Sequence, residues 1–418
     1  MHSGKSQQHD VAVIGAGVVG VSCAAWLQQA GHSVYLIDPV APGENCSFGN
    51  AGVIEASSVI PLANPGTIAR VPRMLFDRKG PLAVRWRYLP RLTPWLWRFL
   101  AASRRSRCEA GARALVPLAQ RAVAAYQPLL QAAGAQALFR YSGWSVVYDS
   151  ERALERTRWE RDFRREHGIA FEFWQGEELR RRLPALGPKA LAAVHYPDVA
   201  WCVEPFELVQ SLAANVQHQG GQRISEQVVE LSRSGQGMRL KFASGRSLEA
   251  GRVVLAGGAW SHQLAAKLGD SVPLETERGY HNMLEAAGVE LPMPLMLDSG
   301  KFVVTPMKHG IRLAGTAEMG GLKLAPDYRR ADVLIERAAA MLPGLSTRPV
   351  SQWMGFRPTL PDSLPVIGPS PHEPRVVYAF GHQHLGLTLA AVTGKLVAQW
   401  IGEGKAEVDL RPYRINRF

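Results

Sequence analysis

The sequence predicts an α/β fold made of two units, one built on parallel strands with flanking helices and one on a mixed sheet. Three segments predict the first unit. Residues 11–38 read as a buried strand, a glycine turn, a helix and a second strand. Residues 252–258 read as a buried strand ending in two glycines, and residues 376–401 as a strand, a glycine-bearing turn and an apolar helix. The first unit therefore lies in pieces at the start, middle and end of the chain, and the segments between them would form the second unit.

The first segment carries the spacing Gly-x-Gly-x-x-Gly directly after its buried strand. Gly15 permits a tight turn, Gly17 lets the backbone approach a pyrophosphate, and Gly20 lets helix and strand pack closely. The helix that opens at Gly17 points unpaired N–H groups and the positive end of its dipole at phosphates. Asp38, at the end of the second strand, is placed to accept hydrogen bonds from ribose hydroxyls. Residues 11–38 therefore predict a binding site for an adenine dinucleotide.

The rest of the chain alternates between helical and extended patterns. A Gly-rich loop over 42–52 follows the first segment, and short strands over 295–315 alternate with turns. Apolar spacing and charge-laced stretches predict helices over 108–136, 151–182, 206–219 and 332–341. Alternating or continuous apolar runs predict strands over 140–148, 227–231, 238–242, 252–256 and 376–380.

Composition indicates an ordinary folded protein with one large core or two domains. Of 418 residues, 46% are hydrophobic and 20% are charged. The apolar run over 11–27 contains three glycines and continues as a β-α-β unit, which argues against a signal peptide or membrane anchor. Cys23, Cys46, Cys108 and Cys202 are scattered without a CxxC pair. We therefore expect a cytoplasmic protein without a disulfide framework or a metal site.

The net charge of +12 is concentrated in one segment. Between residues 70 and 107 there are eleven Arg or Lys and one acidic residue, Asp77. The same segment carries Trp86, Trp95 and Trp97 among several leucines. This mixture suits an interfacial helix on an anionic lipid surface, at the inner face of the cytoplasmic membrane. The alternative is a solvated helix that packs its apolar stripe on the core. Nucleic acid is not expected as a partner, because no nucleic-acid motif accompanies the charge.

The later glycine motifs decide which dinucleotide we expect. Nicotinamide enzymes usually complete their site within one contiguous N-terminal domain. Here similar signals recur far downstream, at 253–258 and 381–386. A cofactor that spans all three segments would be long and mostly buried, which favours FAD.

Five separated motifs resemble those of one enzyme family. They are Gly15–Gly20 with Asp38, Ser-Phe-Gly-Asn-Ala-Gly at 47–52, Leu-Ala-Gly-Gly-Ala-Trp-Ser at 255–261, Gly-Phe-Arg-Pro-Thr at 355–359 with Pro-Val-Ile-Gly at 365–368, and the glycine turn at 381–388. Over nearly its whole length the chain resembles the FAD-dependent D-amino acid oxidoreductases of the glutathione-reductase-like fold. Within that family it is most similar to the small subunits of bacterial D-amino acid dehydrogenases and to the D-hydroxyproline dehydrogenase type.

The resemblance implies an FAD site that these motifs share. Backbone amides of Ala51, Gly52 and Val53 would reach the flavin edge, and the helix beginning near Gly386 would aim its N-terminus at the flavin N1–C2=O region. Val228 matches the family position where main chain meets adenine, although it fits a core strand equally well. The predicted cofactor residues are Gly15, Gly17, Val18, Val19, Gly20, Asp38, Ser47, Asn50, Ala51, Gly52, Val53, Val228, Ala256, Gly257, Trp260, Gly381, His384, Leu385, Gly386, Leu387 and Thr388.

The motifs also divide the chain into two expected domains. A discontinuous FAD-binding Rossmann domain is expected over residues 8–75, 198–268 and 350–418. A mixed α+β substrate domain is expected over residues 76–197 and 269–349.

Substrate binding needs a cation for a carboxylate, and Arg357 is the residue that matches the family. A guanidinium gives planar, bidentate recognition that a lysine does not give. Tyr280 lies where relatives often place a substrate-facing aromatic, but Tyr280 and His281 fit equally well as polar groups of the core. No Asp, Glu or Cys nearby in sequence completes a metal-ligand set with His382 and His384, so we expect them to pack by the flavin.

The implied reaction is oxidative deamination by hydride transfer from the substrate Cα to flavin N5. The expected substrate is a D-amino acid or a cyclic D-imino acid such as D-proline or 4-hydroxy-D-proline. The expected acceptor is a quinone of the respiratory chain. One alternative is an oxygen-using amine oxidase of the glycine or sarcosine type, and another is an RNA-associated flavoprotein module. A disulfide reductase is not expected, since the sequence lacks both a CxxxxC pair and a second Gly-x-Gly-x-x-Gly.

Overall fold

The structure is a computed structural model that describes residues 10–77 and 79–418. Its helices are α1 (Val18–Gln29), α2 (Pro65–Phe76), α3 (Leu89–Ala102), α4 (Arg105–Ala133), α5 (Glu151–Arg156), α6 (Arg158–Glu166), α7 (Gly176–Arg182), α8 (Pro205–His218), α9 (Ser261–Lys267), α10 (Arg329–Met341) and α11 (Gly386–Glu403). Its strands are β1 (Val11–Ile14), β2 (Val34–Ile37), β3 (Val53–Ile54), β4 (Leu82–Val84), β5 (Phe139–Arg140), β6 (Trp144–Tyr148), β7 (Glu172–Gln175), β8 (Ala192–Tyr196), β9 (Ala200–Cys202), β10 (Gln222–Ile224), β11 (Val228–Ser234), β12 (Gly237–Phe242), β13 (Ser247–Ala250), β14 (Arg252–Leu255), β15 (Glu275–Leu284), β16 (Leu295–Leu297), β17 (Phe302–Met307), β18 (Gly310–Met319), β19 (Ser351–Thr359), β20 (Val366–Pro369) and β21 (Val376–Phe380).

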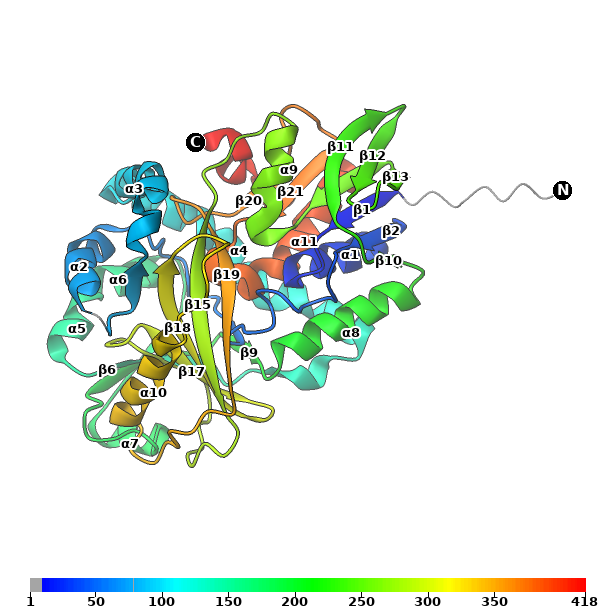
Figure 1. Cartoon of the computed structure of the whole chain (residues 1–418). Helices are drawn as coiled ribbons and strands as arrows, with labels where there is room; N and C mark the ends of the chain where they lie inside the picture. The colour runs from blue at the N-terminus through cyan, green and yellow to red at the C-terminus, as the bar shows by residue number, and fades with distance from the viewer. Residues whose placement is uncertain (1–9, 78) are drawn as a thin grey trace.

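A six-stranded sheet in the order β10-β2-β1-β14-β21-β20 is the centre of the first half of the molecule. Its neighbouring strands are parallel except for β20 and β21. The helices α1, α4, α8 and α11 pack apolar side chains on one face, and β11–β13 with α9 cover the other face (Figure 1). Because the sheet is covered on both faces, β1, β14 and β21 are almost entirely apolar.

A nine-stranded mixed sheet forms the second half, in the order β19-β15-β18-β17-β16-β6-β8-β7, with β4 beside β18. The helix α10 packs on β15 and β18, and a separate apolar core lies beneath it. Figure 1 shows β15, β18 and β19 in the middle of the molecule. The edge strand β19 contacts two short 3-10 helices of the first half, Gly258–Trp260 and Gln383–Leu385. This edge therefore joins the mixed sheet to the first half.

Most elements lie where the sequence predicts them. The helices predicted over 206–219 and 387–401 are α8 and α11, and the strand predicted over 376–380 is β21. The prediction of one helical stretch over 151–182 is wrong, because the strand β7 interrupts it and pairs antiparallel with β8. Trp174 of β7 is buried in the core of the second half. The pairing with a later strand decides the conformation here, and local periodicity does not reveal it.

The expected division into two domains stays a prediction, and its residues 8 and 9 lie outside the described residues. Two observed contacts cross its boundaries. The helix α4, from the segment assigned to the substrate domain, packs on α1 and α11. The strand β19, from the segment assigned to the FAD-binding domain, pairs along its whole length with β15. At these two points an element assigned to one domain packs on, or pairs with, elements assigned to the other.

One helix of the described residues, Gln383–Glu403, is long and apolar enough to cross a membrane by length and composition. It contacts α1 and α4, and 72% of its apolar window is buried inside the protein. Its apolar character matches its place in the middle of a core.

Candidate active site

The glycine turn between β1 and α1 is closely packed. Gly15 has a φ of +107°, and a Cβ added there would be 2.4 Å from the Ala256 carbonyl oxygen. A Cβ added at Gly20 would be 1.9 Å from the Gly15 carbonyl oxygen, so only glycine lets α1 lie this close to the turn. A Cβ added at Gly17 would approach only the Ser47 hydroxyl, at 3.4 Å. The turn is therefore tight toward the sheet and open at the start of α1.

The carboxylate of Asp38 joins the two strand ends of this motif. Its Oδ2 accepts a hydrogen bond from the Ala16 amide at 2.8 Å, and its Oδ1 accepts one from the Val40 amide at 3.1 Å. Burial raises the pKa of Asp38, and the two amides act in the opposite direction. Each carboxylate oxygen has a second lone pair, so Asp38 can still accept a ribose hydroxyl.

The loop after β2 is held by the mixed sheet. Arg312 of β18 donates to the Asn50 carbonyl oxygen at 2.7 Å, and Thr305 of β17 donates to the Ala51 carbonyl oxygen at 2.7 Å. Gly52 has a φ of +81°, and its amide donates to Asn50 Oδ1 at 2.9 Å. This amide therefore bonds within the loop, and the contacts predicted between the loop and a flavin edge stay predictions.

The start of α11 lies beside the end of the same loop. The Thr388 hydroxyl accepts from the Glu55 amide at 3.0 Å and donates to the Val53 carbonyl oxygen at 3.3 Å. Tyr126 of α4 donates to the Leu387 carbonyl oxygen at 2.6 Å. Burial raises the pKa of the Glu55 carboxyl to about 8. The loop, α4 and the first turn of α11 are therefore fixed to one another.

The segments with the predicted cofactor motifs meet in one region and fit a dinucleotide. The Val18 amide of α1 donates to the Ser47 hydroxyl at 3.0 Å. Neither α1 nor α11, both described in full, has an acidic residue in its first turn. A Cβ added at Gly386 would meet nothing within 4 Å. Two helix N-termini free of acidic side chains suit a pyrophosphate and an electron-rich ring. The start of α1 would therefore hold the phosphates of an FAD and the start of α11 would face its flavin, and this placement stays a prediction.

Other predicted cofactor residues lie around this region. Trp260 makes an edge-on contact with Phe356 of β19, with ring centroids 5.8 Å apart. Gly381 has a φ of +82°, and a Cβ there would be 2.5 Å from the Leu360 side chain. Val228 is buried at the start of β11, which matches its reading as a core strand residue. Its contact with adenine stays a prediction.

The guanidinium of Arg357, on β19, lies over the backbone of Gly279, where no side chain fills the space. Its Nη1 donates to Glu277 Oε1 at 2.6 Å and to the Thr316 carbonyl oxygen at 2.8 Å. A Cβ added at Gly279 would be 2.0 Å from Arg357 Nη2, so glycine makes room for the guanidinium. Thr316 has a φ of +57°, a strained conformation for a non-glycine residue. In this conformation the Thr316 carbonyl oxygen accepts the hydrogen bond from Arg357.

His281 lies on the same face of the sheet as Arg357. Adjacent β15 and β19 pair Glu277 with Arg357 and His281 with Trp353, and side chains two and four residues apart on a strand share a face. The rings of His281 and Trp353 stack at 5.3 Å, and His281 Nδ1 lies 3.2 Å from the Gly49 carbonyl oxygen. Burial, with a contribution from the Arg312 charge, lowers the pKa of His281 to about 4. The imidazole is therefore uncharged at neutral pH.

Two further histidines lie near the start of α11. Burial and the nearby Arg357 charge lower the pKa of His384 to about 4. Burial lowers the pKa of His382 to about 3, and its Nε2 lies 3.0 Å from the Thr393 hydroxyl. In residues 10–77 and 79–418 no group of three His, Cys, Asp or Glu side chains is arranged to hold a metal ion.

Tyr280 lies on the opposite face from Arg357. Tyr280 pairs with Met354 and Arg278 pairs with Phe356. These positions alternate with Glu277 and Arg357 along the two strands, so their side chains point to the other face. The Tyr280 hydroxyl donates to Glu318 Oε2 at 2.5 Å and accepts from the Asp327 amide at 2.9 Å. The structure therefore does not bring Tyr280 together with Arg357 and His281, and a catalytic role for it has no support in this placement.

Two neighbours of Arg357 were not singled out by the sequence. Glu277 carried a usable signal, because it stands four residues before His281 in a strand and so shares its face. Cys46 lies in a loop without periodicity, and no sequence signal points to it. Burial raises the pKa of its thiol to about 11, against the effect of the nearby Arg357. Cys46 is therefore a neutral thiol beside the guanidinium.

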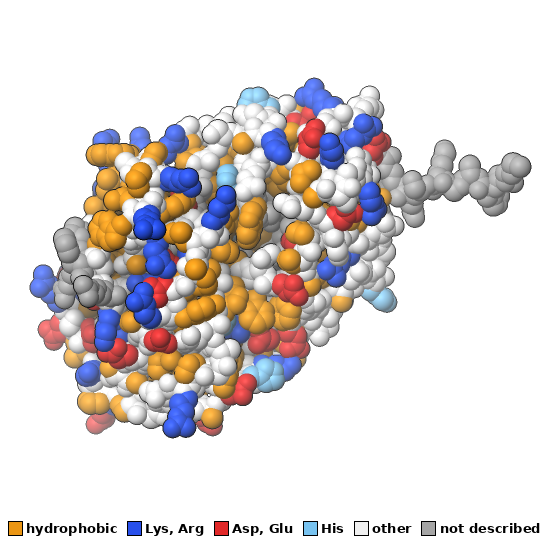
Figure 2. All heavy atoms as spheres, in the orientation of Figure 1, with side chains coloured by type: hydrophobic (Ala, Val, Ile, Leu, Met, Phe, Trp, Pro, Cys, Tyr) orange, Lys and Arg blue, Asp and Glu red, His pale blue; other side chains and the backbone are white. Residues whose placement is uncertain are grey.

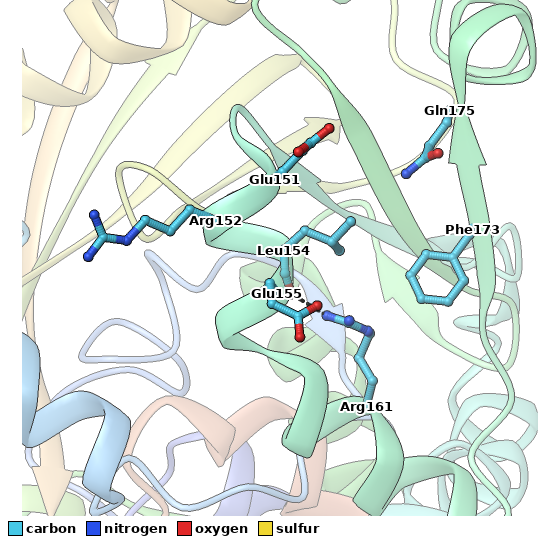
Figure 3. Close-up of a pocket in the computed structure, with 7 residues that line it drawn as sticks. All are labelled: Glu151, Arg152, Leu154, Glu155, Arg161, Phe173 and Gln175. Carbon is cyan, nitrogen blue, oxygen red and sulfur yellow. Dashed lines mark hydrogen bonds between the residues drawn. The ribbon is translucent and has the colours of Figure 1, made fainter.

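A hollow of about 690 Å³ lies apart from these residues, on the second half of the molecule. Its lining comes from α5, α6 and β7, and Figure 3 shows the Arg161 side chain in it near Leu154, Glu155 and Phe173. The Arg161 guanidinium lies 5.3 Å from the centre of the Phe173 ring. None of the predicted site residues lines this hollow.

The chain is similar to known proteins over nearly its whole length. A family model described as "DAO: FAD dependent oxidoreductase" matches residues 10–400. A D-amino-acid oxidase of Bradyrhizobium diazoefficiens is 37% identical over 415 residues, which are 98% of each chain. A D-amino acid dehydrogenase 2 of Ralstonia nicotianae is 30% identical over 430 residues, covering 97% of this chain and all of that one.

Solved structures show the same fold. A glycine oxidase from Geobacillus kaustophilus superimposes with a TM-score of 0.78 at 22% identity, covering 98% of this chain and 99% of that one. An L-proline dehydrogenase from P. horikoshii superimposes with a TM-score of 0.75 at 20% identity, covering 98% of both. The predicted fold class, the FAD cofactor and the oxidoreductase class are confirmed. The chain belongs to the DAO family of FAD-dependent oxidoreductases.

Proposed function

We propose that this protein oxidises a D-amino acid or a cyclic D-imino acid whose carboxylate binds Arg357. One observation carries the proposal: a guanidinium held by Glu277 over the bare backbone of Gly279, on the sheet face that also bears His281. The relatives support the substrate class, since those at 37% and 30% identity are a D-amino-acid oxidase and a D-amino acid dehydrogenase.

Arg357 binds and orients the substrate. Its Nη1 makes two short hydrogen bonds and its Nη2 donates a longer one, of 3.4 Å, to the Gly315 carbonyl oxygen. These bonds fix the plane of the guanidinium and leave Nε and the second hydrogen of Nη2 as donors in one orientation. A carboxylate bound by two parallel hydrogen bonds has a fixed direction as well as a fixed place. The substrate Cα is thereby held in one position, which is the main contribution a protein makes to such a reaction.

The surrounding groups favour a neutral substrate amine. When bound, FAD accepts the hydride that leaves the substrate Cα. His281 and His384 are uncharged at neutral pH, and the Glu277 carboxylate is already paired with Arg357, so none of these groups is free to hold an ammonium. Oxidation therefore needs no dedicated base among these residues once the neutral amine binds.

The electron acceptor and the exact substrate are further parts of the proposal. We take a quinone as the acceptor and a D-proline-like or 4-hydroxy-D-proline-like imino acid as the substrate, from the resemblance of the 276–281 and 381–388 motifs. A second candidate is an oxygen-using oxidase, which the 37% identity to a D-amino-acid oxidase favours. The two candidates share the Arg357 site and differ in what reoxidises the flavin.

Anaerobic reduction of the bound flavin tests the substrate class. The purified holoenzyme is mixed without oxygen with D-proline, 4-hydroxy-D-proline, D-alanine, glycine and their L-counterparts where these exist. We expect the D-compounds to bleach the flavin and the L-compounds to leave it oxidised. Reduction by none of the D-compounds would contradict the proposal. Oxygen and a soluble quinone are then offered to the reduced enzyme in parallel, and the faster reoxidation identifies the acceptor.

A further inference from the structure

The helix α3 has two apolar stripes, and the protein covers only one of them. Leu92 and Ala102 are its buried residues, and Trp95 stacks on Phe99 at 5.1 Å. These four positions, spaced by three or four residues, form the inward stripe. Trp97 lies outside this stripe and is 69% exposed. A tryptophan costs free energy to expose to water, so an exposed one marks a contact surface.

The exposed stripe continues beyond Trp97. Leu100, three residues later on the same face, is 43% exposed. Trp86, in the 3-10 helix Trp86–Tyr88 just before α3, is 74% exposed. These three exposed side chains lie along α3 and the turn before it, and we call them the apolar patch. Two of them are indoles, the side chains most suited to a membrane interface.

The segment that carries this patch is basic and contains no acidic residue. Residues 87–107 contain six arginines and no Asp or Glu. Arg87, Arg91 and Arg98 are exposed, and no carboxylate of the described residues lies within 4 Å of them. Figure 2 shows hydrophobic and basic side chains intermixed over the part of this face where Figure 1 places α3. The charge is therefore available to a partner outside the chain.

The patch is fixed to the rest of the fold at the start of α3. Arg85 forms an ion pair with the buried Glu318 of β18. Tyr88 donates to Glu275 Oε1 of β15 at 2.9 Å. Both contacts join this surface to the strands that carry the candidate site. A partner bound at α3 would therefore hold the whole enzyme in one orientation.

We propose that Trp86, Trp97 and Leu100 with Arg87, Arg91 and Arg98 form a docking surface for an anionic phospholipid membrane. Charge complementarity decides between occupants: an array of arginines around exposed indoles matches anionic headgroups above an apolar interior. A second copy of this chain would bring the same positive charges together, which opposes association. A helix of 14 residues lying flat gives about 21 Å of contact, enough for peripheral binding. The proposal does not depend on which substrate the enzyme oxidises.

Co-sedimentation of the holoenzyme with vesicles tests the docking surface. We expect binding to vesicles that contain phosphatidylglycerol, much weaker binding to pure phosphatidylcholine, and release at high salt. The double variant Arg91→Glu/Arg98→Glu should bind anionic vesicles at least about tenfold more weakly, because each basic residue near the surface contributes separately. Trp97→Ser should weaken binding to both the anionic vesicle and any neutral one. Oxidation measured with a soluble acceptor should stay unchanged in these variants.

Matched control variants separate this surface from general charge and exposed aromatics. Lys189→Glu/Lys405→Glu reverses two exposed cations on other elements, and Phe173→Ser removes an aromatic that is 46% exposed. Both controls should bind vesicles as the wild type does.

Three outcomes would overturn the proposal. Equal binding of anionic vesicles by wild type and the arginine variant would remove α3 as the surface. Binding of an RNA oligonucleotide without binding of vesicles would assign the charge to nucleic acid. A dimeric mass in sedimentation velocity that becomes monomeric in Trp97→Ser would assign the patch to a second copy.

Discussion

Gly279 decides where the charge of Arg357 lies. The guanidinium occupies the space that a side chain at position 279 would fill, with Nη2 2.0 Å from the position of an added Cβ. Gly279 pairs with Gly355 and Arg357 pairs with Glu277, so the two residues lie on neighbouring strands two residue pairs apart and on the same face. The placement of the charge is therefore a property of the strand pair and depends on a residue that has no side chain.

Gly279→Ala should raise the KM for the substrate by at least about tenfold while FAD stays bound, because the added methyl displaces the guanidinium. Steady-state kinetics and the flavin content of the purified protein measure both effects. Gly402→Ala is the matched control, since a Cβ there approaches only the His32 ring, at 3.8 Å. An unchanged KM in Gly279→Ala would show that the guanidinium does not need its observed position.

Tyr280→Phe should lower the stability of the protein and leave the KM for the substrate unchanged. Its hydroxyl bonds to Glu318 and to the Asp327 amide on the far face of the sheet. Removing it deletes two hydrogen bonds, although Glu318 keeps its ion pair with Arg85, and we expect this to cost about 0.5–1.5 kcal/mol of unfolding free energy. Denaturant unfolding should show this loss, and the KM should stay as in wild type. A raised KM with unchanged stability would place Tyr280 back in the substrate site.

The sequence could single out Arg357 as a candidate, but it could not show which neighbouring side chains share its face of the sheet. Tyr280 and His281 are consecutive in a strand, so their side chains must point to opposite faces. Which of them shares the face of Arg357 depends on the register between β15 and β19, whose paired residues are about 80 positions apart. That register is a long-range property, and the motifs around either residue do not encode it.

At the level of elements, the β1–α1 unit was predictable and the sheet edge was not. The glycine spacing, buried strands and terminal Asp38 are local signals, and the structure places them in one tight turn. The sequence assigned residues 350–359 to the nucleotide-binding half, whereas β19 hydrogen-bonds to β15 at the edge of the mixed sheet. A strand between two units offers no local sign of which sheet it joins.

Gly20→Ala should abolish tight FAD binding. The added Cβ would lie 1.9 Å from the Gly15 carbonyl oxygen, so α1 would have to move away from the turn that its N-terminus completes. The flavin-to-protein ratio after purification measures the effect. Ala24 is buried in the same helix, and Ala24→Gly serves as a control that keeps the turn and loses only some stability. A fully loaded Gly20→Ala variant would contradict the assignment of this turn to the phosphates.

The whole molecule should lose stability as the pH falls from about 6.5 toward 4. Burial lowers the pKa of His281, His382 and His384 to about 4, 3 and 4, whereas the same side chains titrate near 6.5 when unfolded. In that window the unfolded chain binds more protons, so lowering the pH favours unfolding by up to about 1.4 kcal/mol per pH unit for each histidine. Glu55, with its pKa raised to about 8, acts in the opposite sense and offsets part of this dependence.

Denaturant unfolding of the holoenzyme at pH 7 and pH 5 measures this dependence. His382→Gln should show a weaker loss between the two pH values than wild type, since one titrating group is removed. A free energy of unfolding with the same pH dependence in both proteins would contradict the buried, neutral state of His382.

Across the whole chain, composition and motif order predicted the α/β class, the FAD cofactor and the oxidoreductase class. Composition and motif order did not predict how the two halves pack on each other. The helix α4 comes from a segment assigned to the second half, yet its apolar face packs on α1 and α11. An amphipathic pattern shows that a helix has a partner and leaves open which partner it has.

The central claim is that Arg357 holds the substrate by its carboxylate, and one thermodynamic cycle tests it most directly. Anaerobic flavin reduction is measured for wild type and Arg357→Ala, each with D-proline and with pyrrolidine, the same ring without the carboxylate. The account predicts that the substitution weakens D-proline to the level of pyrrolidine and leaves pyrrolidine unchanged. Equal losses for both compounds, or none for D-proline, would contradict it.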